Sequence, residues 1–133
     1  EDEIQSLGKF SSNLGIAFQI QDDILDYYGD ENLTGKKLGK DFEEGKYTLP
    51  VILALKNTSP ENRSKLKSLF RTRKQEDFQD VLDILNLANT YEEIQKIFFF
   101  YSTICEEELK NVPSNEYRDS LEDIVANLGT RLT

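Results

Sequence analysis

The stretch GIAFQIQDDILDYYGD, residues 15–30, places three aspartates within the apolar body of a helix. Apolar side chains recur at spacings of three and four before and within this stretch, which is the pattern of an amphipathic helix. The pattern predicts one helix from the start of the chain to about Tyr28. Asp22, Asp23 and Asp26 then lie near its C-terminal end, where the helix dipole disfavours negative charge. These acids therefore need a positive partner.

The rest of the chain is also predicted to be helical. Helical spacing or helix-start signals cover residues 48–57, 59–70, 78–89, 90–112 and 115–128. Between Gly29 and Gly45, four glycines and alternating charges predict a loop rather than a helix or a strand. The sequence has no alternating strand pattern of useful length and no internal repeat. We therefore predict an all-α fold.

Several helix ends can be predicted from capping residues. Ser59, which precedes a proline, is expected to be an N-cap, and Thr90 with Glu93 fits a capping box. Ser114 is expected to cap the last helix, and Gly129 is expected to end it. In the helix between residues 90 and 112, Ile94, Ile97, Phe98, Tyr101, Ile104 and Cys105 form the predicted core stripe.

Length, composition and charge limit the classes of function. The 133 residues, 38% of them hydrophobic, are enough for one domain with a core. The net charge of −9, without histidine, repels nucleic acid and anionic lipid. No apolar run approaches the roughly 18 residues of a membrane span. A single cysteine, Cys105, excludes an internal disulfide and fits a reducing compartment. We expect a cytoplasmic protein with no nucleic-acid partner and no transmembrane segment, and a core role for Cys105.

The three aspartates have the geometry and chemistry of a metal site. Asp22 and Asp26 are four residues apart, about 40° around a helix, so their carboxylates can converge on one cation with Asp23 at the edge. A site of oxygen ligands favours Mg²⁺, which shares its coordination with substrate phosphates. Lysines that could bind such phosphates follow in the Gly-rich segment: Lys36, Lys37, Lys40 and Lys46. A solvated acidic face is the alternative, but the apolar setting and the nearby lysines favour a metal and diphosphate site.

Four ordered motifs connect these residues to a known family. They are Phe18-Gln19, Asp22-Asp23-x-x-Asp26, Gly35-Lys36-x-x-Gly39-x-Asp41 and Glu44-Gly45-Lys46-x-Thr48-Leu49-Pro50. The series resembles the second aspartate-rich region of the trans-type isoprenyl (polyprenyl) diphosphate synthases. Its last motif is more similar to geranylgeranyl and longer-chain, octaprenyl-like members than to farnesyl synthases. The resemblance is strongest over residues 1–55, and NEYRDSLEDIVANL, residues 115–128, resembles the family's last helix.

The resemblance implies the isoprenoid synthase helical-bundle fold and a prenyl transfer reaction. In this family, isopentenyl diphosphate is condensed with an allylic diphosphate, and Mg²⁺ ions lie between two facing aspartate-rich motifs. Homodimers are the family norm. The implied partners of this chain are therefore the two diphosphate substrates, and the implied cofactor is Mg²⁺.

The resemblance also implies roles for individual residues. The implied metal ligands are Asp22 as the principal ligand with Asp23 and Asp26 in support, the implied diphosphate ligands are Lys36 and Lys46, and Gln19 is implied to lie beside the reacting allylic carbons. Asp22, Asp26, Lys46 and Gln19 are thus the implied catalytic residues. Lys37 and Lys40 are expected to be solvated loop charges, and Asp41 is expected to be a partner for a lysine.

One part of the family pattern is missing from the sequence. Nothing in it resembles the first aspartate-rich motif, and the chain has no methionine. We therefore expect residues 1–133 to be the C-terminal half of a polyprenyl synthase domain, inactive as an isolated chain. A non-catalytic synthase-like subunit and a helical interaction module are the alternative functions.

Overall fold

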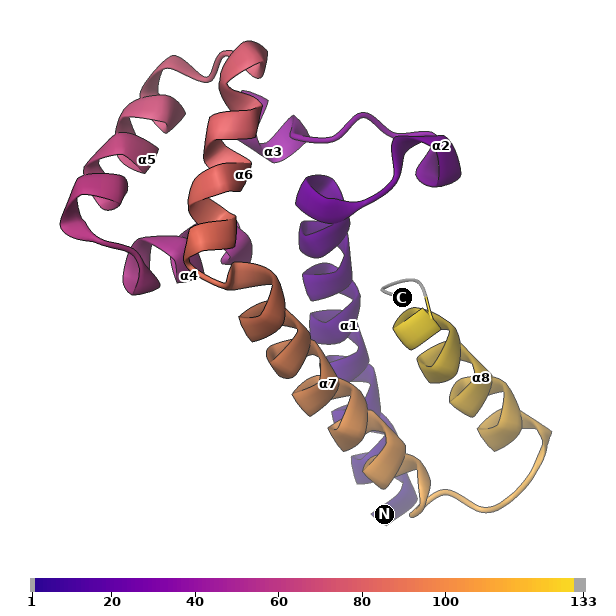
Figure 1. Ribbon diagram of the computed structural model, residues 1–133. Helices are drawn as coiled ribbons and strands as arrows, with labels where there is room; N and C mark the ends of the chain where they lie inside the picture. The colour runs from indigo at the N-terminus through magenta and orange to yellow at the C-terminus, as the bar shows by residue number, and fades with distance from the viewer. Residues whose placement is uncertain (1, 131–133) are drawn as a thin grey trace. The chain divides into compact units, whose positions relative to one another are not determined.

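The computed structural model describes residues 2–130, and every regular element in this part of the chain is a helix (Figure 1). In chain order the elements are α1 (Asp2–Tyr28), α2 (Glu31–Thr34), α3 (Lys40–Glu43), α4 (Leu49–Asn57), α5 (Pro60–Thr72), the 3-10 helix η1 (Gln75–Asp77), α6 (Phe78–Leu87), α7 (Thr90–Leu109) and α8 (Glu116–Thr130). Residues 2–130 contain no β-strand. The predicted all-α fold is therefore confirmed. No helix in this part of the chain is both long enough and apolar enough to span a lipid bilayer.

The helices form two compact units. The inner unit comprises Asp22–Gln95, and the terminal unit comprises Glu1–Gln21 together with Lys96–Thr133. The last turns of α1 and the first turn of α7 belong to the inner unit, and the rest of both helices belongs to the terminal unit. Each unit has its own core.

The inner unit is built around a cluster of aromatic rings. Phe42 of α3 is fully buried, with its ring centroid 5.0 Å from that of Phe70 and 6.1 Å from that of Phe78. Tyr27, near the end of α1, stacks on Phe78 at 5.7 Å. Helices α4, α5 and α6 pack on one another and supply most of the remaining core (Figure 1). This core holds α3 close to the end of α1.

The segment between Gly29 and Gly45 is more ordered than the sequence predicts. It contains the short helices α2 and α3 instead of a continuous loop. The Asp30 carboxylate caps α2 by accepting a hydrogen bond from the Asn32 amide at 2.9 Å. Gly35 ends that helix in the left-handed region at φ 69°. The prediction of a loop was wrong because helices of four residues are too short to show helical periodicity.

The predicted N-cap of α5 is confirmed, whereas the capping box of α7 is not. The Ser59 hydroxyl accepts a hydrogen bond from the Asn62 amide at 3.2 Å. Thr90 is instead the first helical residue of α7, and its buried hydroxyl has no hydrogen-bond partner within residues 2–130. The Glu93 amide donates to the Asn89 carbonyl at 3.2 Å, and Asn89 has a left-handed backbone at φ 54°. The sharp turn at Asn89 therefore moves the start of α7 by one residue.

The predicted ends of α8 also need correction. Asn115, rather than Ser114, caps the helix, since its side-chain oxygen accepts from the Arg118 amide at 3.0 Å. Gly129 lies inside α8 and does not end it. Tyr117, in the first turn of the helix, is 81% exposed.

The terminal unit has a smaller core around the predicted core cysteine. Its buried members are Phe10, Cys105, Leu109, Val112 and Val125. The Cys105 thiol is fully buried and donates to the Phe10 carbonyl with a sulfur–oxygen distance of 3.8 Å. Burial, aided by the negative charge of Glu106, raises the pKa of Cys105 to about 11. Gln21, also fully buried, donates through Nε2 to the Leu128 carbonyl at 2.7 Å. The full burial of Cys105 agrees with its predicted role in the core.

Aromatic residues of α7 divide as the helical spacing predicts. Phe98 is buried and Tyr101 is half-buried, whereas Phe99 and Phe100 are exposed. In α1, several apolar residues are not covered, and Ile4 is 75% exposed. The apolar surface of α1 is therefore wider than the face that the terminal unit buries.

The raised pKa of Cys105 predicts how stability changes with pH. Below about pH 9 the thiol is protonated in both the folded and the unfolded chain. Between about pH 9 and pH 11 only the unfolded thiol ionises, so the free energy of unfolding falls by about 2 kcal/mol as the pH rises. The Cys105→Ala variant has no thiol and should not show this decrease in the free energy of unfolding. Urea denaturation of both proteins between pH 8.5 and 10.5 should show that the wild type loses more stability than the variant, and parallel losses would contradict the assignment.

Candidate functional site

The three aspartates of the QDDILD stretch occupy three different environments. Asp22 is exposed, Asp23 is only 8% exposed, and Asp26 is half-buried. Successive residues of an α-helix are rotated by about 100°, so α1 turns Asp23 inward while Asp22 faces outward. The three carboxylates are therefore not equivalent in what they can bind.

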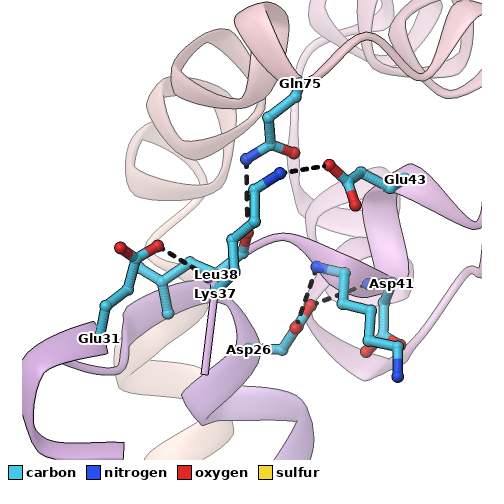
Figure 2. Close-up of polar contacts among 8 residues, drawn as sticks. Asp26, Glu31, Lys37, Leu38, Asp41, Glu43 and Gln75 are labelled. Atoms are coloured by element: carbon cyan, nitrogen blue, oxygen red, sulfur yellow. Dashed lines mark hydrogen bonds and ion pairs between the residues drawn. The ribbon is translucent and has the colours of Figure 1, made fainter. Parts of the chain in front are cut away.

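Asp26 is turned toward the start of α3 (Figure 2). One carboxylate oxygen accepts from the Lys40 amide and the other from the Asp41 amide, each at 3.1 Å. The Asp26 backbone carbonyl accepts from the Gly39 amide at 2.8 Å. Burial raises the pKa of Asp26, and the hydrogen bond from the Asp41 amide acts in the opposite direction. Asp26 thus joins the end of α1 to the segment that carries the lysines.

A Mg²⁺ ion needs oxygen donors that converge on one point. Within residues 2–130, no three Asp, Glu, Cys or His side chains lie close enough together to hold a metal ion. Among these described residues, Asp22, Asp23 and Asp26 do not converge as expected, because Asp23 is buried and Asp26 is turned toward α3. Mg²⁺ commonly uses one or two carboxylates and completes its shell with water and substrate phosphates. An exposed Asp22 fits that pattern, provided that a diphosphate supplies further oxygens.

The Gly-rich segment is held by side chains from several elements (Figure 2). Glu31 of α2 accepts from the Leu38 amide at 2.9 Å, and Gln75 of η1 donates to the Leu38 carbonyl at 3.4 Å. Lys37 forms an ion pair with Glu43 at 2.8 Å. Lys37 is exposed, as expected of a solvated loop charge, and α3 additionally brings the Glu43 carboxylate within its reach.

Lys46 lies at the end of the same segment and is exposed. Its amide donates to the Asp41 carbonyl at 2.8 Å, and its ammonium pairs with Glu44 at 2.9 Å. The hydrogen bond to Glu44 raises the pKa of Lys46 and lowers that of Glu44, so the ammonium is charged at neutral pH. An ion pair exposed to water is weak, so an incoming anion can compete with Glu44 for the lysine. Lys36 and Lys40 are also exposed.

Some residues that shape this segment could not be recognised from the sequence. Arg73 donates to the Glu44 carbonyl at 3.2 Å across 29 positions of sequence, and the contact between Gln75 and Leu38 spans 37 positions. Arg73 directly follows the last residue of α5 and Gln75 is the first residue of η1, and the sequence around them has no local signal for such a role. Gln19 lies on α1 in the terminal unit and is exposed.

The chain is similar to known proteins of one family in both sequence and fold. The sequence profile described as Polyprenyl synthetase matches residues 1–88. The all-trans-nonaprenyl-diphosphate synthase (geranyl-diphosphate specific) of Rhodobacter capsulatus is 33% identical over 117 residues, which cover 88% of this chain and 36% of that protein. The chain spans about a third of the length of the curated relatives it matches.

Solved structures show the same likeness in three dimensions. The crystal structure of a decaprenyl diphosphate synthase from R. capsulatus superposes with a TM-score of 0.88 at 30% identity, covering 100% of this chain and 42% of that one. The geranylgeranyl pyrophosphate synthase of Corynebacterium glutamicum, complexed with isoprenyl diphosphate and magnesium, gives a TM-score of 0.82 at 27% identity, with coverages of 96% and 37%. With the family profile matching well over half of its residues, the chain belongs to the polyprenyl synthetase family.

Proposed function

We propose that this chain is part of a Mg²⁺-dependent polyprenyl diphosphate synthase that condenses isopentenyl diphosphate with an allylic diphosphate. The observation that carries the proposal is the arrangement within the inner unit. An exposed Asp22 lies one turn before Asp26, which is tied directly to the segment carrying Lys46. The C. glutamicum relative, which contains magnesium and isoprenyl diphosphate, supports the choice of ligands.

Each residue of the proposed site has a role that suits its environment. Asp22 presents its carboxylate to Mg²⁺, with Asp23 and Asp26 behind it as supporting residues. Lys36 and Lys46 bind the allylic diphosphate through their ammonium groups, and Gln19 lies beside the allylic carbons. Bound Mg²⁺ supplies positive charge to the diphosphate as it leaves. The lysines act in the same direction, because fixed cations stabilise negative charge where it develops.

We further propose that residues 1–133 do not perform the condensation by themselves. The family resemblance assigns the first aspartate-rich motif to a part of the synthase that this sequence does not contain. The limited share of each relative that the chain covers supports this view. In the longer protein we expect a cytoplasmic homodimer, as the family resemblance implies.

A chimera tests the function directly. Residues 1–133 would replace the matching segment of the R. capsulatus decaprenyl diphosphate synthase, which aligns with all of this chain. Labelled isopentenyl diphosphate and an allylic diphosphate are then supplied with Mg²⁺. We expect prenyl diphosphate product from the chimera and none from the 133-residue chain alone.

Each arm of this experiment can contradict the proposal. Product from the isolated chain would refute the claim that it is inactive alone. A chimera that is folded by circular dichroism and is stabilised by Mg²⁺ with diphosphate, yet forms no product, would favour a non-catalytic subunit. A folded chain with no response to Mg²⁺ and diphosphate would favour a helical interaction module.

A further inference from the structure

Asp26 has a geometry that distinguishes it from a metal ligand. Both of its carboxylate oxygens face backbone amides of α3, and its carbonyl holds the Gly39 amide. We propose that Asp26 is a positioning residue that fixes the backbone of the segment carrying Lys46, and that it does not coordinate Mg²⁺. This inference rests on the proposed function, since it specifies how Asp26 supports the diphosphate site.

Helix α3 needs an external cap, and Asp26 supplies it. The helix has only four residues, and its N-cap is Gly39, which makes no side-chain hydrogen bond. The first amides of a helix have no partner inside the helix and are normally satisfied by a capping side chain. Gly39 has φ 81°, a conformation that residues with a Cβ rarely adopt. Asp26 therefore provides, from α1, the oxygens that the N-cap residue itself cannot offer.

Two hydrogen bonds connect Asp26 to Lys46. The Asp26 carboxylate accepts from the Asp41 amide at 3.1 Å, and the Asp41 carbonyl accepts from the Lys46 amide at 2.8 Å. Phe42, the next residue, is fully buried among aromatic rings and anchors α3 from its apolar side. The Lys46 backbone is thus linked through α3 to the Asp26 carboxylate on one side and to the buried Phe42 ring on the other.

The same contacts argue against a metal at Asp26. The two backbone amides of α3 already offset the negative charge of the Asp26 carboxylate, because amide groups at the start of a helix carry partial positive charge. A Mg²⁺ ion bound to either oxygen would be a second positive partner for it and would weaken its hydrogen bond to α3. Asp22 is exposed and accessible to a metal without such a rearrangement.

Two variants separate positioning from ligation. Asp26→Asn keeps one acceptor oxygen but loses one of the two amide contacts. We expect amide hydrogen exchange at Lys40, Asp41 and Lys46 to accelerate by about tenfold, as the loss of a charge-assisted hydrogen bond implies. Asp41→Asn is the matched control, because it removes a charge from the same segment while Asp41 contributes only backbone atoms to the link. Exchange in the control should stay close to that of the wild type.

Binding of inorganic diphosphate provides the readout that a purely structural role would not give. Isothermal titration of the 133-residue chain at saturating Mg²⁺ should show about fivefold weaker diphosphate binding for Asp26→Asn. The free Mg²⁺ concentration for half-saturation, measured at saturating diphosphate, should be unchanged. Asp41→Asn should bind diphosphate as tightly as the wild type or more tightly, because less negative charge surrounds Lys46.

The outcomes distinguish this inference from the proposed function. Unchanged exchange at Lys40 and Asp41 in Asp26→Asn would overturn the positioning role. A raised Mg²⁺ requirement in that variant would overturn the claim that Asp26 is not a ligand. If the wild-type chain binds no diphosphate at any Mg²⁺ concentration, the proposed diphosphate site fails, and the exchange measurements still decide whether Asp26 holds α3.

Discussion

Asp22→Asn is expected to abolish Mg²⁺-dependent diphosphate binding by the chain and to lower turnover of the chimera by about 10²- to 10³-fold. The exposed Asp22 carboxylate is the one of the three aspartates that is neither buried nor committed to α3. A neutral carboxamide is a poor ligand for a hard divalent cation, which prefers charged oxygen donors. Titration with Mg²⁺ and inorganic diphosphate measures the first effect, and labelled isopentenyl diphosphate measures the second.

The stability of the variant should change little, because Asp22 lies on an exposed helix face. Removing a negative charge near the C-terminal end of α1 should even be slightly favourable, since the helix dipole opposes that charge. Asp80→Asn is the matched control, because Asp80 is exposed on α6 of the same unit and has no proposed role. Equal binding and turnover in wild type and Asp22→Asn would refute the assignment of Asp22 as the metal ligand.

The long helices could be predicted because their periodicity extends over many turns. Helix α1 runs for 27 residues and ends at Tyr28, where the loss of the apolar pattern places its end. Buried positions such as Phe98 and Cys105 also follow from helical spacing alone. In these helices, local sequence and tertiary packing favour the same conformation.

Features that depend on distant partners could not be predicted in the same way. Helix α3 is one turn long and is capped by Asp26, which lies 14 positions before its first residue. The sequence indicates that Asp26 is part of an acidic motif, but both of its oxygens face amides that local pattern cannot locate. Arg73 and Gln75, which follow α5 in the chain, contact the same segment across 29 and 37 positions of sequence. The acidic motif could therefore be recognised in the sequence, whereas the different environments of its three aspartates required the fold.

The ion-pair partners of the lysines could not be predicted from the sequence either. Lys37, expected to be solvated, is paired with Glu43, and Lys46 is paired with Glu44. Neither pair follows helical spacing, because the backbone turns through Gly39 and Gly45 in left-handed conformations. A sequence pattern gives the number of charges in such a segment, and the turns decide which of them meet.

Gly39→Ala is expected to lower the free energy of unfolding by about 3 kcal/mol and to weaken diphosphate binding. Gly39 has φ 81°, which costs about 1 kcal/mol or more for a residue with a Cβ. An added Cβ would also lie 2.8 Å from a ring carbon of Phe78. That ring cannot simply move aside, because it is packed against Tyr27 and Phe42. Overpacking of this kind typically costs about 1 to 3 kcal/mol. Urea denaturation measures the change in stability.

Gly35→Ala separates the cost of the left-handed backbone from the cost of the contact with Phe78. Gly35 has a similar backbone at φ 69°, but a Cβ there would meet no atom within 4 Å. Gly35→Ala should therefore lower the free energy of unfolding only by the backbone cost, about 1 kcal/mol. The difference in stability between the two variants then measures the effect of the close approach of Gly39 to Phe78. The Gly39 amide also donates to the Asp26 carbonyl, so displacement of Gly39 should loosen the link to Lys46 as well. Equal destabilisation by the two substitutions would show that the aromatic core does not constrain this turn, and the position of Lys46 would then depend on the hydrogen bonds from Asp26 without support from packing.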